Sequence, residues 1–259
     1  MRYGIAMRCR WMLATVVVCA CKSAPAPQAE PSTAPRFVVG VSPGPGMTAF
    51  TASFVRESDL RYRDAHCTAT SLRDGAEPPS LDGGRVEAWV AGGQVLGHTD
   101  RSAEGVYRAA VRVALPAGTP LAASVAGGAD VPAHRFRSPA KVPTSVRRTA
   151  PAQGFNLRAG SGLEVRWEGG DSSHVTLTLS LEPPQGTQGA GLLVSCVVPR
   201  SSGSFTIPAA ALSPSLVPAE ARSAVLLVAA TDRVREGDYA LDVVPLGGED
   251  DQVVGTFAR

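Results

Sequence analysis

The chain has 259 residues, of which 44% are hydrophobic, 19% charged and 5% aromatic, so it can bury a core in one large domain or in two of about 100 to 150 residues. Its 27 Gly and 21 Pro residues form less than a fifth of the chain and follow no every-third-residue period, which excludes a collagen-like rod and low-complexity disorder. The formal net charge is +2 and no run of five like charges occurs, so the composition gives no indication of nucleic-acid binding. No apolar stretch reaches the roughly 18 residues that a membrane-spanning helix needs.

The N-terminus has the layout of an export signal. Three arginines precede an uncharged run of eleven residues, which is too short to cross a bilayer and ends in Val18-Cys19-Ala20-Cys21. This tetrapeptide resembles the lipobox of bacterial lipoproteins, although the family prefers Ala, Ser or Thr where this chain has Cys19. The resemblance implies that residues 1–20 are a signal peptide and that Cys21 becomes the lipidated N-terminus. A signal peptide cleaved elsewhere, with Cys21 an ordinary thiol, is the alternative.

The segment that follows the lipobox is typical of a tether. Residues 21–35 are rich in Pro and Ala and contain no aromatic residue, which predicts an extended linker between a membrane surface and a folded domain. Loss of the three leader arginines changes the formal net charge from +2 to −1, so the mature chain has no basic surface for nucleic acid. Lys22 stands where, by resemblance to enteric lipoproteins, Asp causes retention in the inner membrane. We therefore expect the outer membrane.

From residue 36 onward, apolar and polar residues alternate with period two between turns rich in Gly, Pro, Asp and Ser, which is typical of half-buried antiparallel strands. The alternation is clearest in 163–168 and 175–181, where every odd-numbered position is apolar. The one helical candidate is 209–212, a single turn that follows Pro208 and ends before Pro214. In chain order, the predicted strands are 38–41, 48–55, 67–70, 86–90, 106–113, 121–125 and 135–137, then 163–168, 175–181, 192–198, 204–207, 225–230, 239–244 and 253–257.

A stretch rich in Pro and Arg, 138–151, divides these strands into two sets. Each half is about the size of one immunoglobulin-like domain of ~100 residues. We therefore predict an all-β chain with two tandem antiparallel immunoglobulin-like β-sandwiches, 36–141 and 142–259.

The second predicted sandwich carries a resemblance to a known family. Residues 162–167, with Trp167, are similar to the strand of fibronectin type III modules whose Trp enters the core. Residues 237–243, with Tyr239, are similar to a late strand with an inward Tyr. The resemblance implies the fold of that family and carries no function with it.

Two cysteines, Cys67 and Cys196, lie in predicted strands of different halves. An exported chain meets an oxidising compartment, which permits a disulfide. A bridge requires the two domains to pack with these Cα atoms within about 7 Å, and we expect two buried thiols as the more usual arrangement. Cys196 lies in the apolar run 192–198, where a thiol is unreactive, so a catalytic role is not expected.

We predict neither a metal site nor a cofactor. His66 and Cys67 are adjacent, so on a strand they point to opposite faces, and no second pair with metal-ligand spacing is present. His98, His134 and His174 are isolated and are expected at the solvated surface. The sequence contains no nucleophile elbow, Walker loop, zinc-protease helix or dinucleotide turn, which argues against an enzyme. An extracytoplasmic hydrolase with its site in loops is the minority alternative.

Trp89 is the candidate binding residue. The alternation of residues 86–90 places Trp89 on the face opposite to Ala88, and sugar-binding sandwiches present exposed aromatic residues. Trp89 is thus a candidate glycan contact, and packing under a loop or against the neighbouring domain is the alternative. We expect a lipid-anchored cell-envelope module that binds or scaffolds, held to the outer membrane by its N-terminal lipid. Its partner would be an envelope protein or a glycan, and not nucleic acid.

Overall fold

The computed structural model describes residues 34–258 apart from 74–78, 185–188 and 246–251. The predicted lipobox residues Val18, Cys19, Ala20 and Cys21 therefore lie outside the described residues. The described strands are β1 (Phe37–Gly44), β2 (Met47–Phe54), β3 (Leu60–Arg63), β4 (Cys67–Arg73), β5 (Val86–Val90), β6 (Val95–Thr99), β7 (Tyr107–Val111), β8 (Pro120–Val125), β9 (His134–Arg135), β10 (Ala140–Lys141), β11 (Val146–Ala150), β12 (Asn156–Arg158), β13 (Leu163–Gly169), β14 (His174–Glu182), β15 (Ala190–Pro199), β16 (Ser204–Ile207), β17 (Ser223–Glu236), β18 (Tyr239–Val243) and β19 (Gln252–Ala258).

The regular structure is almost entirely strand, which confirms the predicted all-β class. Three single-turn 3-10 helices, Glu57–Asp59, Arg200–Ser202 and Ala209–Leu212, complete the described elements. The last of them occupies the four residues that the flanking prolines predicted. None of the helical segments in the described ranges has the length and apolarity that crossing a membrane requires.

The strands form one large sheet and two small ones. The large sheet has the order β3-β4-β15-β14-β17-β18-β1-β2-β7, with β19 beside β17 and β12 beside β19. The small sheets have the orders β10-β8-β5-β6, with β9 beside β8, and β11-β13-β16. Each small sheet packs on part of the large one, so the predicted sandwich packing is confirmed.

Period-two alternation explains how each strand takes its place. In β13 the burial pattern alternates buried and exposed from Leu163, and in β14 it alternates buried and half-buried from Val175. One face of each strand therefore packs in a core while the other remains accessible. Trp167 on β13 is 4% exposed, as the resemblance implied, and its indole N–H donates to the carbonyl of Arg200 at 3.0 Å.

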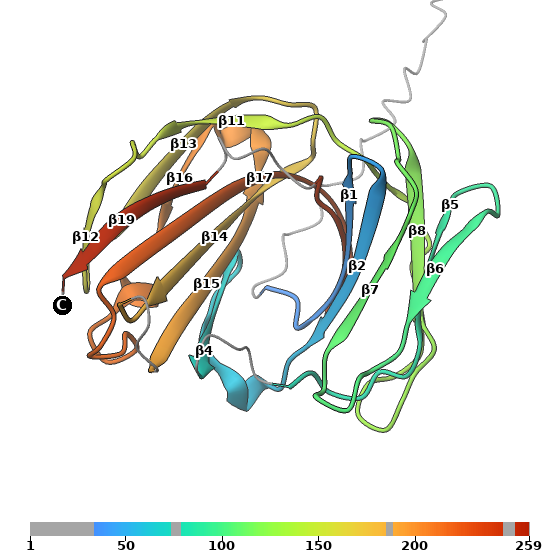
Figure 1. Cartoon of the computed structure of the whole chain (residues 1–259), viewed down its shortest axis with the longest axis horizontal. Coiled ribbons are helices and arrows are strands. Elements are labelled where there is room, and N and C mark those ends of the chain that lie inside the picture. Colours follow the sequence, from blue (N-terminus) through green and yellow to red (C-terminus); the bar gives the residue numbers. More distant parts are fainter. Residues whose placement is uncertain (1–33, 74–78, 185–188, 246–251, 259) are drawn as a thin grey trace, which may run out of the picture. The chain divides into compact units, whose positions relative to one another are not determined.

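The two hydrophobic cores do not follow the predicted division of the chain at residue 141. The first core combines β1, β2, β5, β7 and β8 with Leu241 and Val243 of β18, near the C-terminus. The second core combines strands of the C-terminal half with Cys67 and Ala69 of β4, near the N-terminus. Figure 1 shows β4, coloured cyan, beside β15, coloured orange, although the two strands are far apart in the sequence.

Strand pairing is the physical reason for this exchange. β1 pairs in parallel with β18, with Phe37 opposite Tyr239, and β4 pairs antiparallel with β15, with Cys67 opposite Cys196. The 14-residue strand β17 then joins the two parts, because its first residues pair with β14 and its last five pair with β18. The stretch 138–151 still carries the chain from one core to the other, between Val142 and Val146.

The large sheet uses its two faces differently. Along β17, Leu226 and Val228 pack in the second core, and Val234, which has the same parity, packs against the first. Both cores therefore lie on one face of the large sheet. The sheet bends between β4 and β15 on one side and β1 and β2 on the other (Figure 1), and residues of these strands line a cavity on its other face.

Candidate functional site

The hollow face of the large sheet contains a cavity of about 340 Å³. Its walls come from β1, β2, β3, β4, β14, β15, β17 and β18, from the segment that leads into β1, and from connecting residues that include Asp59 and His66. Most of the polar side chains along the strands of its lining are hydroxyls: Thr51, Ser53, Thr68, Thr70, Thr178 and Ser195. The hydroxyls of the cavity therefore all come from strands.

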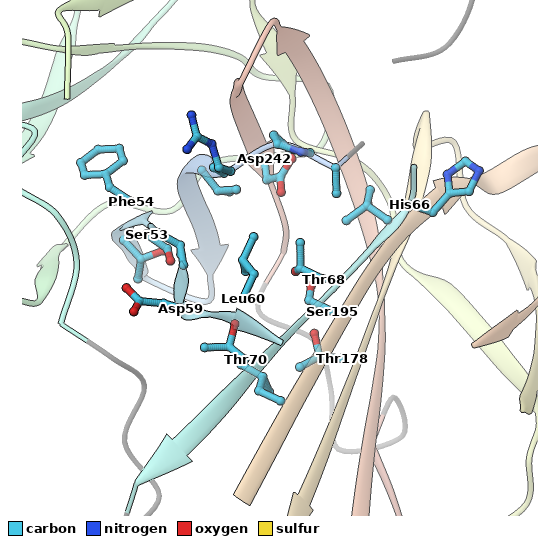
Figure 2. Close-up of a pocket in the computed structure, with 18 of the residues that line it drawn as sticks. Ser53, Phe54, Asp59, Leu60, His66, Thr68, Thr70, Thr178, Ser195 and Asp242 are labelled. Atoms are coloured by element: carbon cyan, nitrogen blue, oxygen red, sulfur yellow. The ribbon is translucent and has the colours of Figure 1, made fainter. Parts of the chain in front are cut away.

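Three of these hydroxyls form a row across neighbouring strands. Ser195 on β15 is directly opposite Thr68 on β4 and directly opposite Thr178 on β14. Neighbouring strands lie about 4.8 Å apart, so successive hydroxyls in this row are spaced by about that distance. All three side chains are half-buried, and no hydrogen bond within the described residues uses their side-chain oxygens. Figure 2 shows the three residues together on the floor of the cavity.

The alternation of the strands places these hydroxyls on the cavity side. The residues next to Thr68 and Ser195 point the opposite way, and both Cys67 and Cys196 are fully buried in the second core. Their sulfurs form a disulfide, with the Cα atoms 4.0 Å apart. The expectation of two free buried thiols is therefore wrong. The exchange of β4 into the C-terminal sheet brings the two cysteines opposite each other, which packing of two separate sandwiches did not predict.

A buried ion pair closes one end of the cavity. Arg233 on β17 donates two hydrogen bonds of 2.6 Å to the two carboxylate oxygens of Asp242 on β18. The side chains are 11% and 10% exposed, and the two residues are directly opposed in the sheet. Such a two-bond geometry neutralises both charges. The carboxylate of Asp242 is consequently occupied and is not free to act as a general base.

A glycine leaves room beside this ion pair. Gly40 on β1 is paired with Asp242 on one side and with Thr51 on the other. A Cβ atom at Gly40 would lie 2.5 Å from the Thr51 hydroxyl oxygen, so a larger residue would displace Thr51 from the lining. The site thus consists of two rows of residues on one sheet, a row of hydroxyls and a row that contains the ion pair.

A second group of charges fixes the segment that enters β1. Asp238 accepts hydrogen bonds from Arg36 at 3.0 Å and from Arg63 at 3.1 Å, and Arg63 also donates to Glu57 at 2.7 Å and to the carbonyl of Ala34. Burial alone would raise the pKa of Asp238. The hydrogen bonds and charges of Arg36 and Arg63 outweigh burial and lower the pKa of this carboxyl below its ordinary value.

Trp89 lies away from this cavity. It is half-buried on β5, and the guanidinium of Arg135 lies over its ring, 5.2 Å from the centroid. Trp89 lines a separate groove on the outer face of the β10-β8-β5-β6 sheet. One face of its ring is therefore covered by a cation and is not open for a sugar to stack on.

His134 differs from the expectation of a solvated histidine. Its ring stacks on Tyr239 with centroids 4.1 Å apart and meets Phe136 edge-on at 4.8 Å. Its Nε2 lies 3.3 Å from a carboxylate oxygen of Glu236, and its side chain is 20% exposed. The parallel pairing of β1 and β18 places Tyr239 there, and this long-range pairing is not visible in the sequence near His134.

Apart from His66, which was considered only as a metal ligand, the cavity residues were not singled out from the sequence. The available signal was chemical: the accessible face of 175–181 carries Thr and Ser rather than the charged residues that water-facing strands usually prefer. The described residues contain no group of three or more His, Cys, Asp or Glu side chains that could hold a metal ion. The lining of hydroxyls, with one closed ion pair and the half-buried Asp59 and His66, is suited to hydrogen bonding with a polar ligand.

Comparisons with known proteins add little to this geometry. No protein-family model matches the chain, and no curated protein matches it significantly. Among solved structures, the fibronectin(III)-like modules of Clostridium thermocellum CbhA share 16% identity over 80% of this chain and 89% of that chain, with a TM-score of 0.20. The titin domains I67–I69 share 9% identity over 87% of this chain and 65% of that chain, with a TM-score of 0.18. TM-scores this low carry no argument about this chain, so its fold class rests on its own strands.

Proposed function

We propose that this chain is a lipid-anchored binding module of the bacterial cell envelope and that the cavity on the large sheet is its ligand site. One observation carries the ligand-binding part: the row Thr68, Ser195 and Thr178, whose hydroxyls face the cavity without partners among the described residues. A hydroxyl can both donate and accept, so the row can serve a ligand that does the same.

The ligand that fits this lining is an uncharged polyhydroxyl compound, such as a sugar. The ion pair between Arg233 and Asp242 satisfies its own charges, and the half-buried carboxylate of Asp59 in the same lining can accept hydrogen bonds from the hydroxyls of a neutral ligand. Leu60 and Leu193 supply apolar surface for the C–H groups of a sugar ring. A volume of about 340 Å³ is at the small end of ligand pockets, which favours one or two sugar rings.

The position of the cavity supports a site close to the membrane. Ala34 and Pro35 border the cavity, and the proposed lipid anchor at Cys21 lies thirteen residues earlier in the sequence. Thirteen fully extended residues span at most about 45 Å. With Cys21 acylated, the cavity would lie within that distance of the lipid surface, where envelope glycans are available.

Sugar binding is tested by calorimetric titration of the full-length protein with N-acetylglucosamine and a panel of other neutral mono- and disaccharides. The matched variant T68V/S195A/T178V keeps the shape of the cavity and removes the three hydroxyls. Thr206→Val removes an exposed hydroxyl on β16, outside the cavity, and is the control. We expect saturable binding that the triple variant weakens at least ten-fold, at about 1 kcal/mol for each lost hydrogen bond. Binding that the triple variant retains in full would overturn this ligand site.

Anchoring is tested separately, by intact mass spectrometry and membrane fractionation of the native protein beside Cys21→Ser. The proposal expects a chain that begins at acylated Cys21 in the outer-membrane fraction, and an unprocessed or soluble product from the variant. An unacylated native product in the soluble fraction would remove the anchor from the proposal. The cavity assignment would then stand or fall on the titration alone.

A further inference from the structure

A groove on the outer face of the β10-β8-β5-β6 sheet is a separate candidate site. It has a volume of about 370 Å³ and is bordered by Trp89, Gly92, Ala122, Arg135, Arg137 and Pro139. None of these residues lines the cavity on the large sheet. The groove therefore requires its own explanation.

The sheet register explains how Arg135 reaches Trp89. Trp89 on β5 is opposite Ala122 on β8, and Ser124, two residues further along β8, is opposite Arg135 on β9. Because Ala122 and Ser124 are small, the Arg135 side chain can lie across β8 until its guanidinium covers the indole ring. A guanidinium stacked in this way loses conformational freedom but keeps its in-plane N–H donors.

A second arginine points to the same side. Phe136 is 4% exposed and packs in the first core, so its neighbours Arg135 and Arg137 both face outward. Arg137 lies in a bend just beyond the end of β9, and both arginines line the groove, which allows both side chains to reach one ligand group. Within the described part of the chain, neither guanidinium forms an ion pair with a carboxylate. Two acidic residues lie near these arginines: Glu87 occupies the same cross-strand row as Ser124 and Arg135, and Glu236 accepts the backbone N–H of Arg137 at 2.8 Å.

We propose that this groove binds an anionic group, a carboxylate or a phosphate, carried on a ring-shaped ligand. The fork of the stacked Arg135 matches two oxygens of such a group, and Arg137 supplies a second positive charge. Ala122 and the uncovered part of Trp89 provide the apolar surface for the ring. This proposal is independent of the function proposed for the cavity.

The test uses three probes that share a glucose skeleton: D-glucuronate, D-glucose 6-phosphate and neutral D-glucose. Binding is followed by tryptophan fluorescence of the full-length protein, and Trp89→Phe identifies the part of the signal that comes from the groove. We expect glucuronate, the phosphate sugar or both to produce a saturable Trp89 signal, and the arm that responds identifies the anion. Glucose is expected to give no Trp89 signal, because Trp89 does not border the cavity proposed for neutral sugars.

Charge variants separate the groove from general electrostatics. Arg135→Gln and Arg137→Gln are each expected to weaken anion binding at least ten-fold, whereas Glu87→Gln is expected to strengthen it. Arg158→Gln, an equal charge change at another exposed position, is the control. The proposal is overturned if neither anion gives a Trp89 signal at about 10 mM, if glucose gives the same signal, or if Arg158→Gln weakens binding as much as Arg135→Gln.

Discussion

Arg233 and Asp242 face each other across β17 and β18 and are joined by two hydrogen bonds of 2.6 Å at the end of the cavity. β17 pairs with β14 through its first nine residues and with β18 through its last five. The ion pair therefore lies where the part of the large sheet that covers the second core continues into the part that covers the first. The same two residues thus join the two parts of the large sheet and line the proposed ligand site.

Removing one member of this ion pair should lower the free energy of unfolding more than removing both members. Asp242→Ala leaves the Arg233 charge with little access to water, so we expect the free energy of unfolding to fall by about 3 to 5 kcal/mol. The double variant R233M/D242A removes both charges and should lose much less. Urea unfolding of Arg233→Met, Asp242→Ala and the double variant measures the coupling. Single and double losses that simply add would contradict a direct interaction between the two side chains.

The disulfide between Cys67 and Cys196 closes a loop of 129 residues. Because a cross-link restricts the unfolded chain, we expect C67A/C196A to lose about 2 to 5 kcal/mol in the free energy of unfolding, measured with urea under non-reducing conditions. The reduced wild-type protein should unfold close to the double variant. Two titratable thiols at these positions in the unfolded, unreduced native protein would show that the bridge does not form.

The elements of the fold could largely be predicted from the sequence, but their partners could not. Alternation in 163–168 and 175–181 predicted which side chains are buried, and the structure confirms both strands with that parity. Alternation does not specify which strands pair, because β4 presents the same pattern whether it joins its own half or the other. The exchange of β4 and β18, and with it the disulfide, depends on these long-range pairings.

Short or irregular strands were also missed. β3 has a register shift between Leu60 and Tyr62, and β11 has one between Arg148 and Ala150, and such bulges interrupt the period-two pattern. Trp89 was correctly placed off the core face, but the Arg135 that covers it lies on a strand 46 positions later in the sequence. The cavity escaped notice because its hydroxyls come from strands that only the tertiary pairing brings together.

Gly84 is expected to tolerate no side chain. Its φ is +68°, and a Cβ atom there would lie 2.2 Å from the backbone carbonyl oxygen of Gly127. We expect Gly84→Ala to lower the free energy of unfolding by about 3 kcal/mol or more, because backbone must shift as well as adopt a strained φ. Gly46 has a similar φ of +75° with open space around it. Gly46→Ala should therefore lower the free energy of unfolding by only about 1 kcal/mol. Equal losses in thermal unfolding would contradict the predicted clash.

Asp238 should make the free energy of unfolding depend on pH in the acidic range. Its pKa is lowered in the folded state, since hydrogen bonds from Arg36 and Arg63 outweigh the opposing effect of burial. A carboxyl with a lowered folded pKa stabilises the fold above its unfolded pKa of about 4, and this contribution disappears as the pH falls through the folded pKa. Asp238→Asn should therefore be less stable than wild type at pH 7, by about 0.5 to 1 kcal/mol for a partly exposed ion pair. The difference should begin to shrink below about pH 4, where Asp238 of the unfolded chain takes up a proton, and should close as the pH falls through the lowered folded pKa.

The measurement for Asp238 is urea unfolding of wild type and Asp238→Asn between pH 7 and pH 3. Glu104→Gln, at an exposed position on another loop, removes one negative charge without breaking a described ion pair and controls for net charge. A gap between Asp238→Asn and wild type that stays constant across this range would mean that the ionised carboxylate is not what stabilises the segment entering β1. A gap that closes in acid would show that Arg36 and Arg63 hold this segment at the rim of the cavity through the charge of Asp238.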